Sequence, residues 1–229
     1  LVIDRNPSNL PGMKSIAGWI CGDAVSKEAV DFMSNRIKVN WSEPEIEHKV
    51  KGVMAFSPDR ETSIPFDGAG YMLNRQVLPQ RQNERTLAMG VDFDFEINLT
   101  GLLYDGNQVV GVQGIDYKTK TPYKKTAKVV IDATGMTSML RNQISNTTKM
   151  ERKVDRKDVE STGRHIMYFD QGEEDLTEFD PDYCIIHLDQ DIAPGGYGWV
   201  FPKGKNKVNI GLGVEKTLLD KRNQRLGKN

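Results

Sequence analysis

Cys21 and Gly22 are the first residues of the sequence whose types and position indicate chemistry. They directly precede Asp23 and a stretch with the apolar spacing of a helix, in which Ala24 is the first apolar residue. A helix that begins here would direct the backbone N–H groups of residues 22–24 outward, toward an anion or the polar edge of a ring. Because these side chains are small, a flat ligand could approach closely beside the Cys21 thiol. The ordinary alternative is a buried cysteine followed by a capping glycine.

A second candidate is the aromatic series Tyr197, Trp199 and Phe201. The three residues are spaced two apart, so in a strand their side chains point to the same side. The glycines in and before this series are Gly195, Gly196 and Gly198. A strand with one bare face fits a place where a flat or long molecule lies against the backbone. The alternative is that the three rings belong to an ordinary core, because large aromatic residues dominate cores.

Asp4 and Arg75 could each contact a nucleotide. Asp4 ends the strand-like segment LVID, and in dinucleotide-binding folds an acid at a strand end binds the ribose hydroxyls, ~20 residues after a glycine-rich turn. That turn would precede residue 1, so helix capping or simple solvation of Asp4 remains open. Arg75 follows the segment GYMLN and opens a predicted helix, from which it could reach a pyrophosphate or remain an exposed surface arginine.

The segment KVVIDATGMTSMLR, residues 128–141, predicts a buried strand, a turn of small residues and a short helix. Open α/β sheets bind cofactors beyond the carboxyl ends of their strands, at turns of this kind. Gly135 closes the turn and is therefore a candidate cofactor contact.

Composition and charge exclude several classes. The formal net charge is −1, which provides no overall field for nucleic acid or an anionic membrane. The two cysteines, Cys21 and Cys184, do not make a disulfide framework and favour a reducing cytoplasm. The three histidines show no ligand spacing, so we expect no metal site. The longest apolar run, IAGWICG at 16–22, is far shorter than the ~18 residues of a membrane-spanning helix.

The pattern of elements predicts α/β structure mixed with antiparallel β, in two lobes. We expect a strand ending at Asp4, a helix from 23 to 37, a hairpin at 51–67, and a helix at 74–90 interrupted by Pro79 and capped by Gly90. Closely spaced strands should follow from 91 to 135, then a solvated charge run at 148–160, a second β-rich stretch to 214 and the start of a helix. Both ends of the chain look cut, so we interpret it as an internal piece of a longer protein.

Taken together, four segments resemble the geranylgeranyl reductase family, whose flavoproteins share the fold of p-hydroxybenzoate hydroxylase. The resemblance runs from Leu1 to about Glu215. Its most specific part is the last of the four segments, which are CGDAVSK, GYMLNR, VVIDATGMTSMLR and APGGYGWVFPKGKNKVNIGLG.

The resemblance implies an FAD held in extended form by a partial Rossmann-like lobe with a β-meander, over residues 1–150. A partial antiparallel β-sheet for substrate would occupy residues 151–229, and the strand pair at 50–72 would join that sheet. The N-terminal glycine-rich loop and the C-terminal part of the family are absent from this sequence, so these residues alone should bind FAD poorly.

The resemblance also implies roles for single residues. Asp4 would bind the adenosine ribose, Leu99 would lie by the adenine, and Arg75 would reach the phosphate–ribose region. Cys21, Gly22 and Ala24 would line the isoalloxazine ring, with Cys21 closest to the chemistry. The substrate wall would be formed by Tyr197, Trp199 and Phe201.

The implied activity is that of an oxidoreductase acting on CH–CH groups, which saturates geranylgeranyl chains of archaeal-type lipids or the prenyl tails of chlorophyll and quinone precursors. NAD(P)H or a ferredoxin would supply the electrons. The enzyme would be cytoplasmic, with peripheral contact to the cytoplasmic face of the membrane. Two alternatives are a flavin monooxygenase of the same fold and an isoprenoid-lipid-binding module without flavin.

Overall fold

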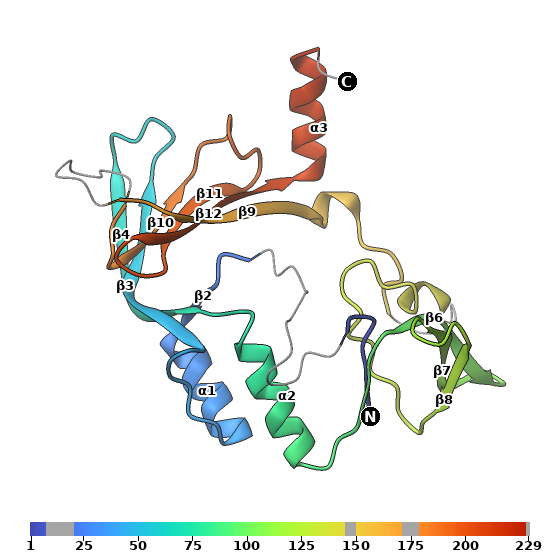
Figure 1. The fold of residues 1–229 in the computed structure, drawn as a ribbon. Coiled ribbons are helices and arrows are strands. Elements are labelled where there is room, and N and C mark those ends of the chain that lie inside the picture. The colour runs from blue at the N-terminus through green and yellow to red at the C-terminus, as the bar shows by residue number, and fades with distance from the viewer. Residues whose placement is uncertain (8–20, 145–149, 171–178, 228–229) are drawn as a thin grey trace. The chain divides into compact units, whose positions relative to one another are not determined.

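Three β-sheets and three α-helices make up the described part of the chain, residues 1–7, 21–144, 150–170 and 179–227, in this computed structural model (Figure 1). The chain divides into two compact units. Unit 1 comprises Leu1–Ala17 and Gln80–Asp155, and unit 2 comprises Gly18–Pro79 and Arg156–Asn229. The expected boundary at residue 150 is close to the observed division after Asp155. Residues 18–79, however, belong with the second unit, since their strands pair with strands beyond residue 156.

Unit 2 is built on a seven-stranded sheet. In spatial order its strands are β2 (Ala24–Ser26), β4 (Ser63–Leu73), β3 (Ile46–Phe56), β10 (Tyr183–His187), β11 (Tyr197–Pro202), β12 (Lys207–Glu215) and β9 (Glu160–Tyr168). Only the β10–β3 pair is parallel, and the other neighbours in this sheet are antiparallel. The parallel pair joins the β3–β4 hairpin to the C-terminal strands, so the strand pair at 50–72 lies in the sheet where we expected it.

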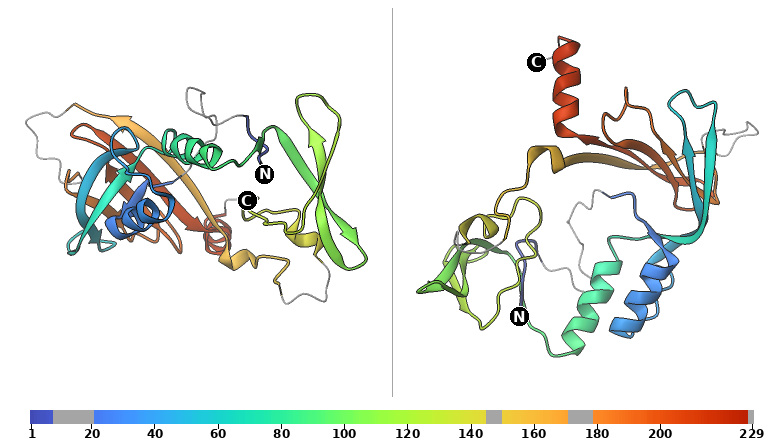
Figure 2. Two further views of the ribbon diagram at one scale, coloured as in Figure 1. Left: turned by 90° about the horizontal axis from the view of Figure 1, so that it is seen from below. Right: turned by 180° about the vertical axis from the view of Figure 1, so that it is seen from behind.

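The β3–β4 hairpin is longer than expected and bends along its length (Figure 2). Its register shifts twice, between Ile46 and His48 and again between Val50 and Gly52. Such irregularities increase the local twist and turn a strand toward a neighbouring segment. At one end of the hairpin, here called its inner end, Ile46 pairs with Leu73. This end lies close to the residues that form the candidate site.

Helix α1 (Lys27–Ile37) begins four residues later than expected, so the prediction of a helix directly after Gly22 is wrong. Residues 24–26 form β2 instead, because Val25 and Ser26 pair with Tyr71 and Gly70 of β4. The Ser26 hydroxyl then accepts a hydrogen bond from the Ala29 N–H and caps the helix. Sheet pairing with a distant strand therefore outweighs the local helical pattern.

Two clusters of buried side chains form the core of unit 2. Val30 of α1 packs with Ile46, Leu73 and Leu78 at the inner end of the hairpin. The second cluster lies on the sheet and consists of Val50, Met72, Cys184, Trp199 and Phe201.

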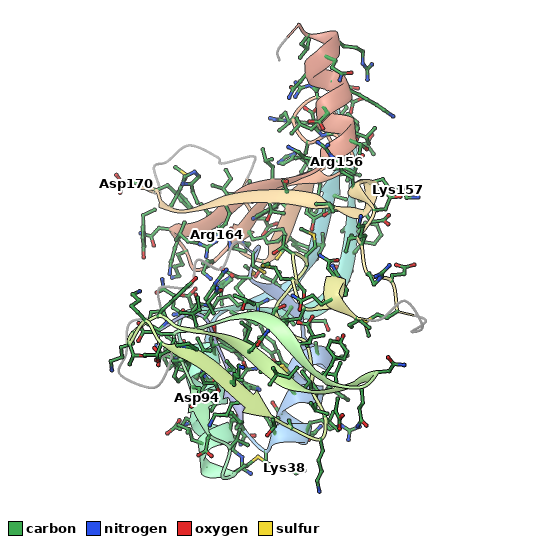
Figure 3. The ribbon with its side chains drawn as sticks, turned by 90° about the vertical axis from the view of Figure 1, so that its right-hand side faces the viewer. Lys38, Asp94, Arg156, Lys157, Arg164 and Asp170 are labelled. Atoms are coloured by element: carbon green, nitrogen blue, oxygen red, sulfur yellow. The ribbon has the colours of Figure 1, made fainter. Side chains whose placement is uncertain are left out.

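Helix α3 (Lys216–Arg225) follows β12 directly. The Glu215 carboxylate accepts hydrogen bonds from the N–H groups of Thr217 and Leu218 and caps the helix. Arg156, labelled near the base of α3 in Figure 3, lies in the 3₁₀ turn η2 (Arg156–Asp158) before β9. Its guanidinium group forms an ion pair with Asp220 of α3. Within the described part of the charge run, residues 150–158 are exposed. This agrees with the prediction of a solvated segment.

Unit 1 contains the two smaller sheets. Strand β1 (Val2–Ile3) is parallel to β5 (Phe93–Asp94), and Asp4 follows β1 as expected. The predicted meander is confirmed by three antiparallel strands, β6 (Ile97–Asp105), β7 (Gln108–Asp116) and β8 (Pro122–Thr126).

Helix α2 spans Leu78–Ala88, so Pro79 stands in its first turn, where proline is tolerated, and does not interrupt it. Arg75 accordingly lies in the turn before α2 and does not open a helix. Gly90, at φ +82°, follows the C-terminus of α2.

The prediction of a buried strand before Asp132 is wrong for the described chain. Val129 and Ile131 are 75% and 86% exposed, and no described strand pairs with this segment. A central strand needs hydrogen-bonding neighbours on both edges, so a β-branched sequence alone does not form one. The short helix expected afterwards is the 3₁₀ turn η1 (Arg141–Gln143).

The Ser26→Ala substitution tests the capping of α1. Loss of the hydroxyl leaves the Ala29 N–H without its acceptor, so the free energy of unfolding should fall by about 1 kcal/mol, seen as a lower melting temperature. Ser34→Ala is the matched control, since the Ser34 hydroxyl bonds back to the Val30 carbonyl inside the helix and alanine is the better helix former. Equal effects of the two substitutions would contradict the capping role.

Candidate functional site

The segment Cys21–Asp23 lies directly on the aromatic strand β11. A Cβ atom at Gly22 would stand 2.6 Å from Cε2 of Phe201, a distance that side chains do not tolerate. Glycine is therefore required here so that the backbone can rest on the Phe201 ring. The contact brings the Cys21 thiol next to the aromatic residues, although the two segments are far apart in sequence.

Asn209 holds the same segment by its side-chain amide. It lies near the start of β12 and is fully buried, with 0% of its surface exposed. Its Nδ2 group donates to the Cys21 carbonyl at 2.8 Å and to Asp23 Oδ2 at 2.9 Å. Its Oδ1 accepts the indole N–H of Trp199 at 3.0 Å. One amide thus connects the aromatic strand with the backbone of Cys21.

Lys203 provides a buried positive charge beside Asp23. Its side chain is 4% exposed, and its Nζ lies 2.8 Å from Asp23 Oδ2 and 2.6 Å from Glu47 Oε2. The ammonium group also donates to the Leu73 carbonyl at 2.8 Å. A buried charge is tolerated when it is paired and hydrogen-bonded in this way. Asp23 has a positive φ of 68°, so the ion pair accompanies an uncommon backbone conformation.

Glu47 also pairs with Lys207, at 2.9 Å. Partial burial lowers the pKa of Lys207, but the hydrogen bond and the charge of Glu47 outweigh burial, so the pKa of Lys207 is raised above its ordinary value. Lys207 therefore keeps its charge at neutral pH. With Arg75 the cluster holds three cationic and two anionic groups, a net charge of +1 next to Cys21.

The Cys21 sulfur accepts two hydrogen bonds. Arg75 Nη2 donates to it at 3.4 Å, and the Asp23 backbone N–H donates at 3.4 Å. Arg75 Nε lies 4.0 Å from Asp23 Oδ1, and both atoms are buried without a hydrogen-bond partner among the described residues. Buried polar atoms normally have partners. Each of these two atoms thus faces the opposite charge beside the thiol without making a hydrogen bond.

The expectation of an outward-facing helix N-terminus at residues 22–24 is wrong. Helix α1 begins at Lys27, and the Asp23 N–H points back to the Cys21 sulfur. Ala24 lies on β2 and pairs with Met72. Polar groups at this site come from the side chains of Arg75, Asp23 and Asn209 instead of from a helix end.

The three rings of β11 lie on one side of the strand, with neighbouring ring centroids 6.1 Å apart. Trp199 and Phe201 are 5% and 7% exposed and belong to the core cluster, whereas Tyr197 is 43% exposed. Burial in the same cluster raises the pKa of the Cys184 thiol to about 12, so this cysteine is a core residue. Of the three residues expected to form the substrate wall, Tyr197 is exposed to solvent and the other two are buried.

Most glycines near β11 are required by the conformation of their own backbone or by the close approach of a neighbouring strand. Gly195 adopts φ +72°, and a Cβ at Gly196 would stand 2.1 Å from the Gly213 carbonyl oxygen. At Gly211 of β12 a Cβ would meet the Gly163 carbonyl oxygen at 2.3 Å and Trp199 Cζ2 at 2.5 Å, so the neighbouring strand and the indole both occupy that space. Only Gly198 has ordinary clearance, with its nearest atom 3.8 Å from a Cβ.

Three of the predicted cofactor contacts lie in unit 1. The Asp4 carboxylate accepts one hydrogen bond, from the Asn6 N–H, and Leu99 lies on β6. Gly135 adopts φ +90° with open space where a Cβ would stand.

The turn before Gly135 is organised by Asp132, which accepts hydrogen bonds from Thr134 and Ser138. Burial raises the pKa of Asp132, but these hydrogen bonds outweigh it and lower the pKa below its ordinary value. The carboxylate is therefore ionised at neutral pH and holds the turn together.

Sequence reasoning missed the polar residues that fix the site. They are Asp23, Glu47, Lys203, Lys207 and Asn209. A local signal existed for one of them, since Asn209 shares its face with Phe201, to which it is paired in register, and an amide on an apolar face needs partners. Among the described residues, no group of three side chains could hold a metal ion.

Comparison with known proteins gives relatives for both halves of the chain. The family model of the geranylgeranyl reductase catalytic domain matches residues 158–228. A digeranylgeranylglycerophospholipid reductase of Sulfolobus acidocaldarius is 34% identical over 219 residues, which are 94% of this chain and 45% of that protein. One of Methanosarcina acetivorans is 27% identical over 85% of this chain and 44% of its own length. The chain spans about half the length of the curated relatives it matches.

Solved structures establish the fold. A geranylgeranyl bacteriochlorophyll reductase-like protein of Thermoplasma acidophilum has a TM-score of 0.76 at 23% identity, covering 99% of this chain and 54% of that protein. The FAD-dependent chondrochloren halogenase of a myxobacterium has a TM-score of 0.67 at 13% identity, over 96% of this chain and 48% of its own. The expected mixed α/β fold is confirmed.

The pair Gly22→Ala and Gly198→Ala tests whether the Cys21 segment rests on Phe201. At Gly22 the added methyl meets a buried ring, so the free energy of unfolding should fall by about 1–3 kcal/mol, a drop of about 2–12 °C in melting temperature. Gly198→Ala should change the melting temperature little, because a Cβ fits there. A tolerated Gly22→Ala would contradict the contact.

Proposed function

Because the chain belongs to the geranylgeranyl reductase family, we propose that the protein is an FAD-dependent reductase that saturates C=C bonds of geranylgeranyl chains in archaeal-type lipids. The observation that carries the proposal is the 34% identity to the Sulfolobus acidocaldarius digeranylgeranylglycerophospholipid reductase over 94% of the chain. The match to the catalytic-domain model at residues 158–228 supports it, because this region contains β11 and β12.

The residues present fit FAD. Arg75 Nε and Asp23 Oδ1 are buried polar atoms without partners among the described residues, and Gly135 has open space in front of its backbone. We assign the ribose to Asp4, the adenine to Leu99, and backbone contact to Gly135, all in unit 1. Unit 2 would contribute Cys21, Gly22, Ala24 and Arg75. When bound, FAD supplies the hydride that reduces an alkene.

Cys21 is the proposed proton donor. Hydrogen bonds from Arg75 and from the Asp23 N–H hold its sulfur in place, and the S–H group of a thiol placed in this way can donate to a third group. Transfer of this proton from Sγ to one alkene carbon would complete the saturation, and water would restore the thiol. An unactivated alkene is a poor hydride acceptor. The position of the proton donor beside it therefore matters more than the acidity of that donor alone.

Tyr197 is the proposed contact for the prenyl chain. Its ring is exposed, whereas Trp199 and Phe201, on the same side of β11, are buried in the core. The ring of Trp199 contacts the rings of both Tyr197 and Phe201 and so supports the proposed wall. Each CH₂ group buried against such a surface contributes about 0.8 kcal/mol. A twenty-carbon chain therefore needs few polar contacts.

Electron supply by NAD(P)H or a ferredoxin, and peripheral contact with the cytoplasmic face of the membrane, belong to the same proposal. A lipid substrate resides in a bilayer, so the enzyme must meet its surface. Among the described helices none is long and apolar enough to cross a membrane. Much of the apolar run at 16–22 lies outside the described residues.

The reaction can be tested with full-length protein that contains this chain. Reduced with dithionite under anaerobic conditions and mixed with a geranylgeranyl lipid, it should yield products heavier by two hydrogens per step in a mass spectrum. Cys21→Ser should lower the rate by about 10²-fold or more, since general acids contribute this much. Cys184→Ala is the matched control, and its rate should stay near that of the parent protein.

Two results would contradict the proposal. A hydroxylated product with oxygen consumption would identify a flavin monooxygenase. Lipid binding without reduction, in a preparation that cannot be reconstituted with FAD, would identify a binding module.

A further inference from the structure

We propose that Asn209 is a positioning residue, which fixes the Cys21 thiol at a set place relative to Trp199 and Phe201. The observation behind this is that a single buried amide makes hydrogen bonds to the Cys21 carbonyl and to the Trp199 indole. The meaning of this placement for catalysis rests on the proposed function, whereas the placement itself does not.

The orientation of the Asn209 amide is determined by its partners. Both hydrogens of Nδ2 are used, toward the Cys21 carbonyl and Asp23 Oδ2, and Oδ1 faces the Trp199 N–H. Rotating the amide by 180° would bring oxygen against two oxygens and N–H against N–H. The side chain therefore has one arrangement in which all its contacts are satisfied.

Consecutive residues of the thiol segment are fixed in three different ways. Cys21 is held through its carbonyl by Asn209, Gly22 rests on the Phe201 ring, and Asp23 is held by Asn209 and Lys203. With the backbone fixed at these points, the remaining freedom of the thiol is the rotation of its own side chain. Arg75, which donates to the sulfur, restricts that rotation as well.

The chain offers variants that separate positioning from general packing. Asn209→Asp keeps the shape of the side chain and an acceptor for Trp199, but it removes both N–H donors and sets a carboxylate against the Cys21 carbonyl and Asp23. Asn209→Ser removes the same donors without adding charge. Trp199→Phe leaves both donations of Asn209 to the thiol segment in place. It removes the indole N–H together with part of a buried ring, so it tests loosened packing near Asn209.

The experiment measures the alkylation rate of Cys21 by iodoacetamide in the folded full-length protein, assigned by peptide mass mapping. Folding of each variant is checked by circular dichroism. We expect Asn209→Ser and, where it folds, Asn209→Asp to raise the Cys21 rate by about tenfold. Trp199→Phe should change that rate by less than twofold, even where it lowers the melting temperature equally.

The proposal is overturned if a folded Asn209 variant leaves the Cys21 rate within twofold of the parent. It is also overturned if Trp199→Phe raises the rate as much as Asn209→Ser does, since the effect would then follow from loosened packing. Steady-state kinetics add a second readout, because displacement of the donor should lower kcat while KM for the lipid changes little. Absence of any reductase activity would refute the proposed function and leave the alkylation result valid.

Discussion

The buried ammonium group of Lys203 is the interaction on which the candidate site depends. It lies between Asp23 and Glu47 and also bonds the Leu73 carbonyl. Removing such a charge from water costs several kcal/mol, so its burial requires that both carboxylates and the carbonyl stand in place together. Three stretches of unit 2 that are far apart in sequence are thereby held at one point: the segment before β2, the inner end of the β3–β4 hairpin, and the turn after β11.

Cys21 acquires its surroundings from this arrangement. Once Asp23 is held, Gly22 rests on Phe201 and the Cys21 carbonyl reaches Asn209. Arg75, located just after the end of β4, then reaches the sulfur. The thiol, a guanidinium group and an aromatic strand thus meet because the backbone between them is fixed, and no helix N-terminus is needed.

Local patterns in the sequence predicted much of the fold. The meander β6–β7–β8, the β3–β4 hairpin and the shared face of Tyr197, Trp199 and Phe201 follow from alternation and turn residues over short distances. The start of α1 was predicted wrongly, since the pairing of residues 24–26 with a strand more than forty residues later cannot be read locally. Val129 and Ile131 have the composition of a strand, but no described strand pairs with them.

The partners of the polar residues of the site were not predictable for the same reason. Lys203 and Asn209 find their partners about 180 residues earlier in the chain, and nothing in the local sequence names those partners. Motif reasoning singled out Cys21, Gly22 and Arg75 from their types and positions, and the resemblance to a family then implied their roles. The Lys203–Asp23 ion pair that positions them is visible only in the folded chain.

A double-mutant cycle on Asp23→Asn and Lys203→Met measures whether the two buried charges hold each other in place. The free energies of unfolding of the four proteins, measured in urea, should show that each single substitution destabilises by about 3 kcal/mol. The double variant should lose about 1–3 kcal/mol less than the sum of the two, because each partner is costly mainly when left alone. Effects that add to within about 0.5 kcal/mol would show that Lys203 does not hold Asp23, and the account of the site would fail.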